Sequence, residues 1–314
     1  MELRQLRYFI AIVEHGSLSR AARALHVAQP ALTQQIRQLE AELSAQLLHR
    51  SAQGVLATDA GKIFYEHAQA ILKQVSDAKS AIAQSTDKPA GPVALGIPQS
   101  VSGAFALPLL SAVRTNYPDI SLQISEELSG NLIEQLRSGR INLAVLFDDG
   151  QLTAFSTTPL VEEELMYVTA SGSRHAARGK TITLARALEA PMILPGPQHG
   201  VRPRIENLVR AAGLTIRDVT DINSIAILKS ALMADMGATI LPVAPVLSEI
   251  ERGALSAWPI SGARISRTVV LCSSRTIPLT NAAAAVERLV LAVTEELCGS
   301  GRWLGAQALT RRKA

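Results

Sequence analysis

Hydrogen-bonding side chains are spaced along residues 29–37 so that they share one face of a helix. Gln29 is followed four and five residues later by Thr33 and Gln34, and Arg37 stands one further turn along. Glutamine can bind adenine through N6 and N7, threonine offers a hydroxyl and a methyl, and arginine suits a phosphate. Together these residue types indicate DNA recognition, although each taken singly is equally typical of a solvated helix face.

The elements around this face are those of a helix-turn-helix. Apolar periodicity predicts helices at 3–15 and 20–25, the second capped by Ser19. A third helix is expected at 30–43, with Pro30 at its first position, where no N–H is needed. Its apolar positions are Ala31, Leu32, Ile36, Leu39 and Leu43. The expected DNA contacts are Ser17, Arg20, Gln29, Pro30, Thr33, Gln34, Arg37, Arg50 and Gln53.

A small wing and a long helix follow. Residues 47–50 and 55–57 predict two short strands joined by a turn. Thr58 then caps a helix expected at 59–84, which has few large apolar residues and no sequence neighbour to pack on. Its simplest partner is the same helix of a second chain.

The remainder of the chain alternates strands and helices. The hinge Ser85–Pro92 precedes strands expected at 93–97, 120–126, 141–147, 164–169, 192–194, 216–222, 238–241 and 267–273. Helices are expected at 103–116, 129–138, 201–212, 224–234, 244–251 and 281–297. This order predicts an α/β fold with mainly parallel sheets, in two lobes. The basic tail after Gly299 is expected to be loosely held.

Composition narrows the class of protein further. The 314 residues are 47% hydrophobic and 18% charged, which fits a globular protein of two or three domains. The net charge of +4 permits a nucleic-acid partner without requiring one. No apolar run is long enough for a membrane helix, and the first 16 residues do not have the pattern of a signal peptide. We therefore expect a cytoplasmic protein without a membrane partner.

Motifs for catalysis are missing from the sequence. The stretch Gly54–Lys62 lacks the spacing of a phosphate-binding loop, and Pro98 stands two residues before Ser100, where a nucleophile elbow needs glycine. Cys272 and Cys298 form no Cys-x-x-Cys pair. We expect no catalytic residue, metal or cofactor. An enzyme and a solute-binding protein without a DNA role remain the poorer alternatives.

The stretch GSLSRAARALHVAQPALTQQIRQLEAELSAQLLHR, followed by TDAGKIFYEHA, resembles the LysR-type transcriptional regulators. AGKIFYEHAQAIL and VALGIPQSVSGAFALPLLSAVR are most similar to the nitrogen-assimilation-control subgroup. The sequence departs from the family pattern at three positions: Ser44 stands where the family often has glycine, Leu48 where it often has phenylalanine, and Gln53 where it often has a basic residue. Matching positions are Gly16, Ser17, Ala21, Ala22, Leu25, Gln29, Pro30, Ala31, Leu32, Gln35, Ile36, Leu39, Glu40, Leu43, Leu47, Arg50, Thr58 and Gly61.

The resemblance implies a winged helix-turn-helix, a linker helix and a two-lobed α/β effector domain similar to periplasmic binding proteins. It implies an activator or repressor that binds double-stranded DNA and a small anionic effector, contacts RNA polymerase, and forms a homodimer or homotetramer. The expected domains are 1–58 for DNA binding, 59–91 for the linker helix and hinge, 92–300 for the effector domain and 301–314 for the tail. Lobe one would comprise 92–163 and 266–300, and lobe two 164–265.

Effector contacts are expected where strands end and helices begin, as is usual for ligands in open α/β folds. The resemblance places them in the cleft between lobes, where carboxylate-binding hydroxyls and helix N-termini would meet. The expected contacts are Gln99, Ser100, Ser102, Ser129, Phe147, Gln198, Arg202 and Asn223. The serines and Asn223 can equally be plain helix caps.

Overall fold

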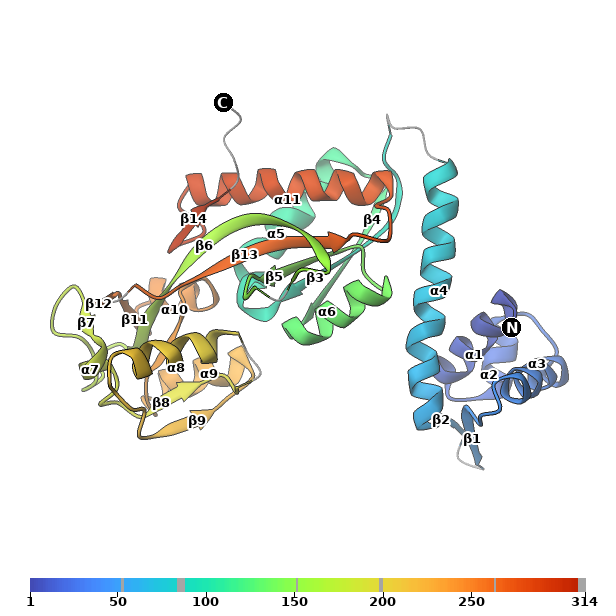
Figure 1. Ribbon diagram of the computed structural model, residues 1–314, viewed down its shortest axis with the longest axis horizontal. Coiled ribbons are helices and arrows are strands. Elements are labelled where there is room, and N and C mark those ends of the chain that lie inside the picture. Colours follow the sequence, from blue (N-terminus) through green and yellow to red (C-terminus); the bar gives the residue numbers. More distant parts are fainter. Residues whose placement is uncertain (52–53, 84–87, 151, 198–199, 263, 310–314) are drawn as a thin grey trace. The chain divides into compact units, whose positions relative to one another are not determined.

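The computed structural model describes residues 1–51, 54–83, 88–150, 152–197, 200–262 and 264–309. The chain divides into an N-terminal unit, Met1–Ala83, and a larger unit that holds most of the residues from Gln84 onward. Figure 1 shows the elements of both units. Among the described helices, none is both long and apolar enough to cross a membrane.

Three helices form the core of the N-terminal unit: α1 (Leu3–His15), α2 (Leu18–Ala24) and α3 (Gln29–Glu42). α2 begins earlier than predicted, because Ser17 and not Ser19 caps it, with Ser17 Oγ accepting from the Arg20 backbone N–H at 3.4 Å. Of the apolar positions expected in α3, Ala31 is exposed, and Leu43 lies beyond the helix with 38% of its surface exposed. The fully buried core residues include Phe9, Ile12, Ala21, Leu32, Ile36 and Leu39.

The predicted wing and long helix are present. β1 (Leu48–Ser51) pairs antiparallel with β2 (Gly54–Ala57), and α4 spans Asp59–Ala83. Thr58 caps α4 as predicted, since its Oγ1 accepts from Gly61 N at 2.9 Å. Gly61 has to be glycine, because a Cβ there would lie 2.1 Å from the carbonyl oxygen of Leu47.

The first turns of α4 do have a neighbour, contrary to expectation. The ring of Phe64 packs edge-on against Phe9 of α1, with the ring centroids 5.2 Å apart. The hydroxyl of Tyr65 donates to Glu14 Oε1 at 3.1 Å. Other apolar side chains of α4 remain exposed, among them Ile63 and Ile82.

The larger unit contains two lobes that share long strands (Figure 1). In lobe one, α5 and α11 cover one face of the sheet and α6 covers the other. Its elements are β3 (Gly91–Pro98), α5 (Gln99–Asn116), β4 (Ile120–Glu127), α6 (Ser129–Ser138), β5 (Leu143–Phe147), β13 (Ser266–Ser274) and α11 (Asn281–Gly299). The hinge prediction falls partly outside the described residues, and its last two residues already belong to β3.

β6 (Phe155–Ala170) links the lobes and is far longer than the predicted strand. Its first part pairs with β13 in lobe one, and its end pairs with β10 (Thr239–Pro242) and β11 (Leu255–Trp258) in lobe two. The register of β6 and β13 shifts beside Pro159, which has no N–H to donate to the ladder.

Lobe two is built around a second core, separate from that of lobe one. Its remaining elements are β7 (Ile182–Thr183), α7 (Leu184–Ala187), β8 (Met192–Leu194), α8 (Val201–Ala211), β9 (Val219–Asp221), α9 (Ile225–Met233), the 3-10 turn η1 (Ala244–Val246), α10 (Leu247–Glu251) and β12 (Ile260–Ser261). The expectation of mainly parallel sheets is only partly met: β3 is parallel to β4 and β5, β7 to β12 and β8 to β9, but β13, β10 and β11 all pair antiparallel.

The segment after α11 is not a loose tail. Gly301 and Gly305 adopt positive φ angles of 71° and 76°, a conformation that favours glycine and lets the chain turn back onto lobe one. Trp303 is only 1% exposed, and its ring lies 5.9 Å from that of Phe105. β14 (Ala306–Ala308) then adds to the sheet beside β6. The final residues, 310–314, lie outside the described part of the chain.

Candidate functional site

The exposed face of α3 presents hydrogen-bonding groups at the start of the helix. Gln29, Pro30, Thr33, Gln34 and Arg37 together line a shallow surface depression. Ala28 precedes the helix and makes no side-chain cap hydrogen bond. The buried residues on the opposite face of α3 fix the direction of this polar face.

The other expected DNA contacts have local roles as well. Ser17 caps α2 and also lies 3.0 Å from the hydroxyl of Ser19, whereas Arg20 is exposed. Arg50 Nη2 lies 3.5 Å from Glu40 Oε2, so its charge is partly balanced within the unit. Gln53 lies outside the described residues.

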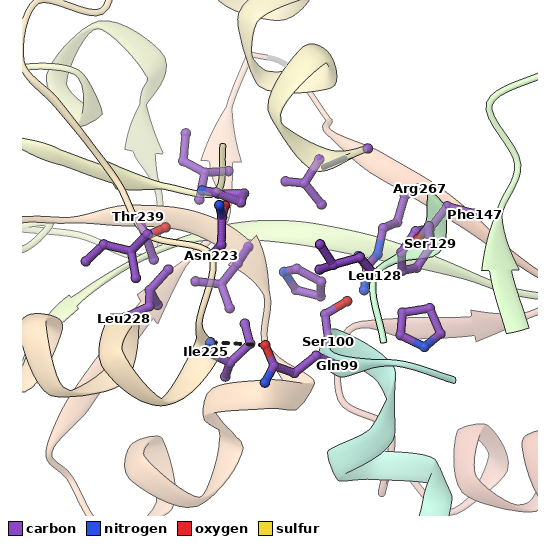
Figure 2. A pocket seen from close by; sticks show the side chains of 18 of the residues that line it. Gln99, Ser100, Leu128, Ser129, Phe147, Asn223, Ile225, Leu228, Thr239 and Arg267 are labelled. Carbon is purple, nitrogen blue, oxygen red and sulfur yellow. Dashed lines mark hydrogen bonds between the residues drawn. The ribbon is translucent and has the colours of Figure 1, made fainter. Parts of the chain in front are cut away.

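A pocket of about 70 Å³ lies between the two lobes of the larger unit (Figure 2). Four helices begin at its walls: α5 and α6 from lobe one, and α8 and α9 from lobe two. Helix N-termini have unpaired N–H groups and a partial positive charge, which favour an anion. The lining residues are Pro98, Gln99, Ser100, Glu127, Leu128, Ser129, Phe147, Pro195, Gly200, Val201, Ile222, Asn223, Ile225, Leu228, Thr239, Ile240, Leu241, Pro242 and Arg267.

Two side chains hold the lobes' loops in place around this pocket. Gln99, the first residue of α5, accepts a hydrogen bond from the Ile225 backbone N–H at 3.2 Å, a contact that crosses from one lobe to the other (Figure 2). Asn223 Oδ1 accepts from Gly196 N at 2.8 Å and so fixes the segment before α8. Two of the expected ligand contacts thus already make structural hydrogen bonds.

Arg267 is the one arginine that lines the pocket among the described residues. It belongs to β13, is 2% exposed, and its Nε donates to Glu163 Oε2 at 2.7 Å. Its guanidinium carbon lies 3.9 Å from the centre of the Phe147 ring, a cation–π arrangement. Burial lowers the pKa of Arg267, and the adjacent carboxylate of Glu163 opposes that shift.

Comparison with known proteins places the chain in a family. The model described as "Bacterial regulatory helix-turn-helix protein, lysR family" matches residues 3–62, and that of the "LysR substrate binding domain" matches residues 86–295. The chain belongs to the LysR family. It is therefore a DNA-binding transcriptional regulator with an effector-binding domain, and nothing in the matches supports a solute-binding protein without a DNA role.

Individual relatives of this LysR-family chain cover nearly its full length. It is 35% identical to the nitrogen assimilation regulatory protein nac of Klebsiella aerogenes, over 93% of this chain and 95% of that protein. The crystal structure of CbnR, a LysR family transcriptional regulator, is 25% identical with a TM-score of 0.69, over 94% of this chain and 99% of CbnR. A full-length OxyR variant from Pseudomonas aeruginosa has a TM-score of 0.71 over 99% of both chains, and at 20% identity it shows the fold alone.

The expected effector contacts are only partly brought together. Gln99, Ser100, Ser129, Phe147 and Asn223 line the pocket, and Gln198 lies outside the described residues. Ser102 and Arg202 do not line it.

The two residues that miss the pocket are held by other partners. The hydroxyl of Ser102 donates to the Gln99 carbonyl at 3.1 Å and also contacts Glu126. Arg202 forms ion pairs with Glu206 at 2.6 Å and with Asp221 at 2.7 Å. Its charge is therefore balanced by these two carboxylates outside the pocket.

Sequence reasoning missed Arg267 and Thr239. One signal was available for Arg267: it opens a predicted strand that continues through the apolar residues 269–272, and a buried charge needs a partner or a ligand. Thr239 carries no such signal, because a threonine in a strand is ordinary.

Proposed function

We propose that this regulator activates or represses its target genes in response to a small anionic metabolite bound between the lobes. The observation that carries the proposal is the pocket itself, where four helix N-termini and the side chain of Arg267 converge. Helix N-termini and a guanidinium both favour an anion, and the Glu127 carboxylate that also lines the pocket is bound by Gln135 Nε2 at 2.8 Å. A ligand that touches both lobes can favour one lobe arrangement over another, which is what coupling to DNA requires.

In the proposed DNA complex, α3 enters the major groove. Gln29, Thr33 and Gln34 would bind base edges, whereas Arg37 and Arg50 would bind phosphates. Ser17, Arg20 and Pro30 would approach the backbone near the turn, and Gln53 at the wing would add a further contact.

Assembly of at least a dimer, and of a homotetramer from two dimers, is part of the proposal. The exposed Ile63 and Ile82 of α4 supply apolar surface for a second copy. A symmetric dimer fits an interrupted, AT-rich inverted repeat, and contact with RNA polymerase would complete activation.

We also propose the division into a DNA-binding domain (1–58), a linker (59–91) and an effector domain from residue 92. The packing of Trp303 and β14 supports extending the effector domain through residue 309. Lobe one would hold 92–163 and the part from 266 onward, and lobe two 164–265. The protein is proposed to act in the cytoplasm and to leave its ligand chemically unchanged, as its relatives are transcription regulators.

A gel shift with the DNA upstream of its own gene tests the DNA-binding part. A thermal-shift screen of small anions on the full chain tests the sensing part. The competing possibility is a constitutive regulator whose pocket is a relic. Binding of DNA with no response to any ligand found in the screen would favour that alternative.

A further inference from the structure

Two polar atoms in the pocket are buried without a hydrogen-bond partner. Among the described residues, Thr239 Oγ1 and Arg267 Nη2 are both inaccessible and make no hydrogen bond, and both residues line this pocket. Arg267 Nη2 forms an ion pair with Glu163 Oε2 at 2.7 Å, an oxygen that already accepts from Arg267 Nε, and makes no hydrogen bond of its own. Leaving buried polar groups without hydrogen bonds is costly. The Arg267 side chain points into the space that Leu128 and Ser100 also face (Figure 2).

Trp303, in the C-terminal segment, helps to hold Arg267 in this position by way of Glu163. The two oxygens of Glu163 have different partners: Oε2 accepts from Arg267 Nε at 2.7 Å, and Oε1 accepts from Trp303 Nε1 at 2.7 Å. Glu163 is 1% exposed, so its carboxylate depends on these two donors. The indole of Trp303 therefore orients Glu163, and Glu163 orients the guanidinium of the pocket.

Besides Arg267, the polar residues that line the pocket are Gln99, Ser100, Glu127, Ser129, Asn223 and Thr239, and the carboxylate of Glu127 accepts from Gln135 Nε2 at 2.8 Å. The remaining lining residues are apolar. Leu128 and Phe147 lie near Arg267, and the lobe-two side is formed largely by Ile222, Ile225, Leu228, Ile240, Leu241 and Pro242. One anionic end and a short apolar body would match these walls.

We propose that the pocket binds a small monocarboxylate with its carboxylate on Arg267, and that Trp303 sets its affinity through Glu163. The inference rests on the proposed function in one respect, namely that the pocket is the ligand site. Trp303 and Glu163 are positioning residues here, since neither is among the residues that line the pocket.

The probes are propionate, butyrate and valerate, each compared with its neutral amide of the same shape. Binding is measured on the full chain carrying Trp258→Phe, which leaves Trp303 as the single tryptophan of the sequence. We expect at least one carboxylate to bind in the millimolar range or tighter and to change the Trp303 emission. Its amide should bind at least about tenfold more weakly, because Arg267 favours the charge.

Variants separate the ligand class from the positioning role. The double variant Glu163→Gln with Arg267→Gln replaces the buried ion pair by two neutral amides and should remove the preference for carboxylate over amide. Trp303→Phe keeps an aromatic ring but loses the N–H, and should weaken carboxylate binding about three- to tenfold while amide binding stays unchanged. This variant is followed by calorimetry, with Trp258→Phe as the matched control.

Each outcome decides one part of the proposal. If no carboxylate binds at 20 mM (on the order of the weakest useful affinity), or if amides bind equally well, the ligand class is overturned. Equal carboxylate affinity in the Trp303→Phe variant overturns the positioning role. A neutral ligand that binds and shifts the footprint on DNA contradicts this inference alone. A carboxylate that binds through Arg267 without altering the footprint contradicts the proposed sensing function instead.

Discussion

Glu40 joins the DNA-reading helix to the wing, and substitutions there test how the N-terminal unit is held together. Its Oε1 accepts backbone hydrogen bonds from Leu47 N at 2.9 Å and Leu48 N at 3.2 Å, and its Oε2 faces Arg50. Leu47 and Leu48 are both buried. Glu40→Ala leaves two buried donors without an acceptor at about 1–2 kcal/mol each, so local stability should fall by about 2–4 kcal/mol.

Glu40→Gln is the matched control, because its side-chain carbonyl can still accept from both backbone N–H groups. It loses only the ion pair with Arg50. The side chains of Arg50 and Glu40 are 31% and 17% exposed, and such a pair contributes less than about 1 kcal/mol. Random DNA should bind this variant more tightly, since Arg50 is freed from its carboxylate.

Hydrogen-exchange mass spectrometry of the segment around Leu47 and Leu48 measures the difference. Exchange should rise about 30- to 1,000-fold in Glu40→Ala and less than about fivefold in Glu40→Gln. Similar exchange in the two variants would refute the reasoning, because the backbone hydrogen bonds would then contribute no more than the ion pair.

Three further predictions concern the DNA-binding residues, the two cysteines and the pocket between the lobes. Gln29→Ala should cost about 1–3 kcal/mol on the specific site and little on random DNA in gel shifts, whereas Arg50→Ala should weaken both; equal losses for Gln29→Ala would contradict base reading. Burial raises the pKa of Cys272 to about 12 and of Cys298 to about 11, so at pH 8 a thiol reagent should label neither quickly, and labelling at the rate of a free thiol would contradict their burial. Gln99→Ala removes the hydrogen bond between lobes and should raise the Kd of any pocket ligand several-fold in calorimetry; an unchanged Kd would show that this bond does not support the bound form.

Local patterns were enough to predict the N-terminal unit. The spacing of Leu32, Ile36 and Leu39 fixes the buried face of α3 and therefore its exposed face, and Thr58 marks the start of α4. The errors there are small ones, such as the choice of Ser19 over Ser17 as a cap, because neighbouring serines offer the same chemistry.

Features that depend on distant pairing were not predictable in this way. β6 is continuous across both lobes because it pairs with β13 first and with β10 and β11 later, and no local signal reveals such partners. Trp303 looked like part of a polar tail, yet its indole N–H meets Glu163, 140 residues earlier in the chain. Arg202 was expected in the pocket because it starts a helix, but Asp221 and Glu206 bind it instead.

The central claim is that a small ligand in the interlobe pocket changes how this regulator occupies DNA. DNase footprinting on its own upstream DNA tests this, with the tightest-binding carboxylate from the screen titrated into wild type and into Ser100→Ala, a half-buried pocket residue. We predict that the wild-type footprint changes in extent, with a midpoint at the ligand's Kd, and that the midpoint moves to higher concentration in Ser100→Ala. An identical footprint at zero and at saturating ligand would contradict the claim.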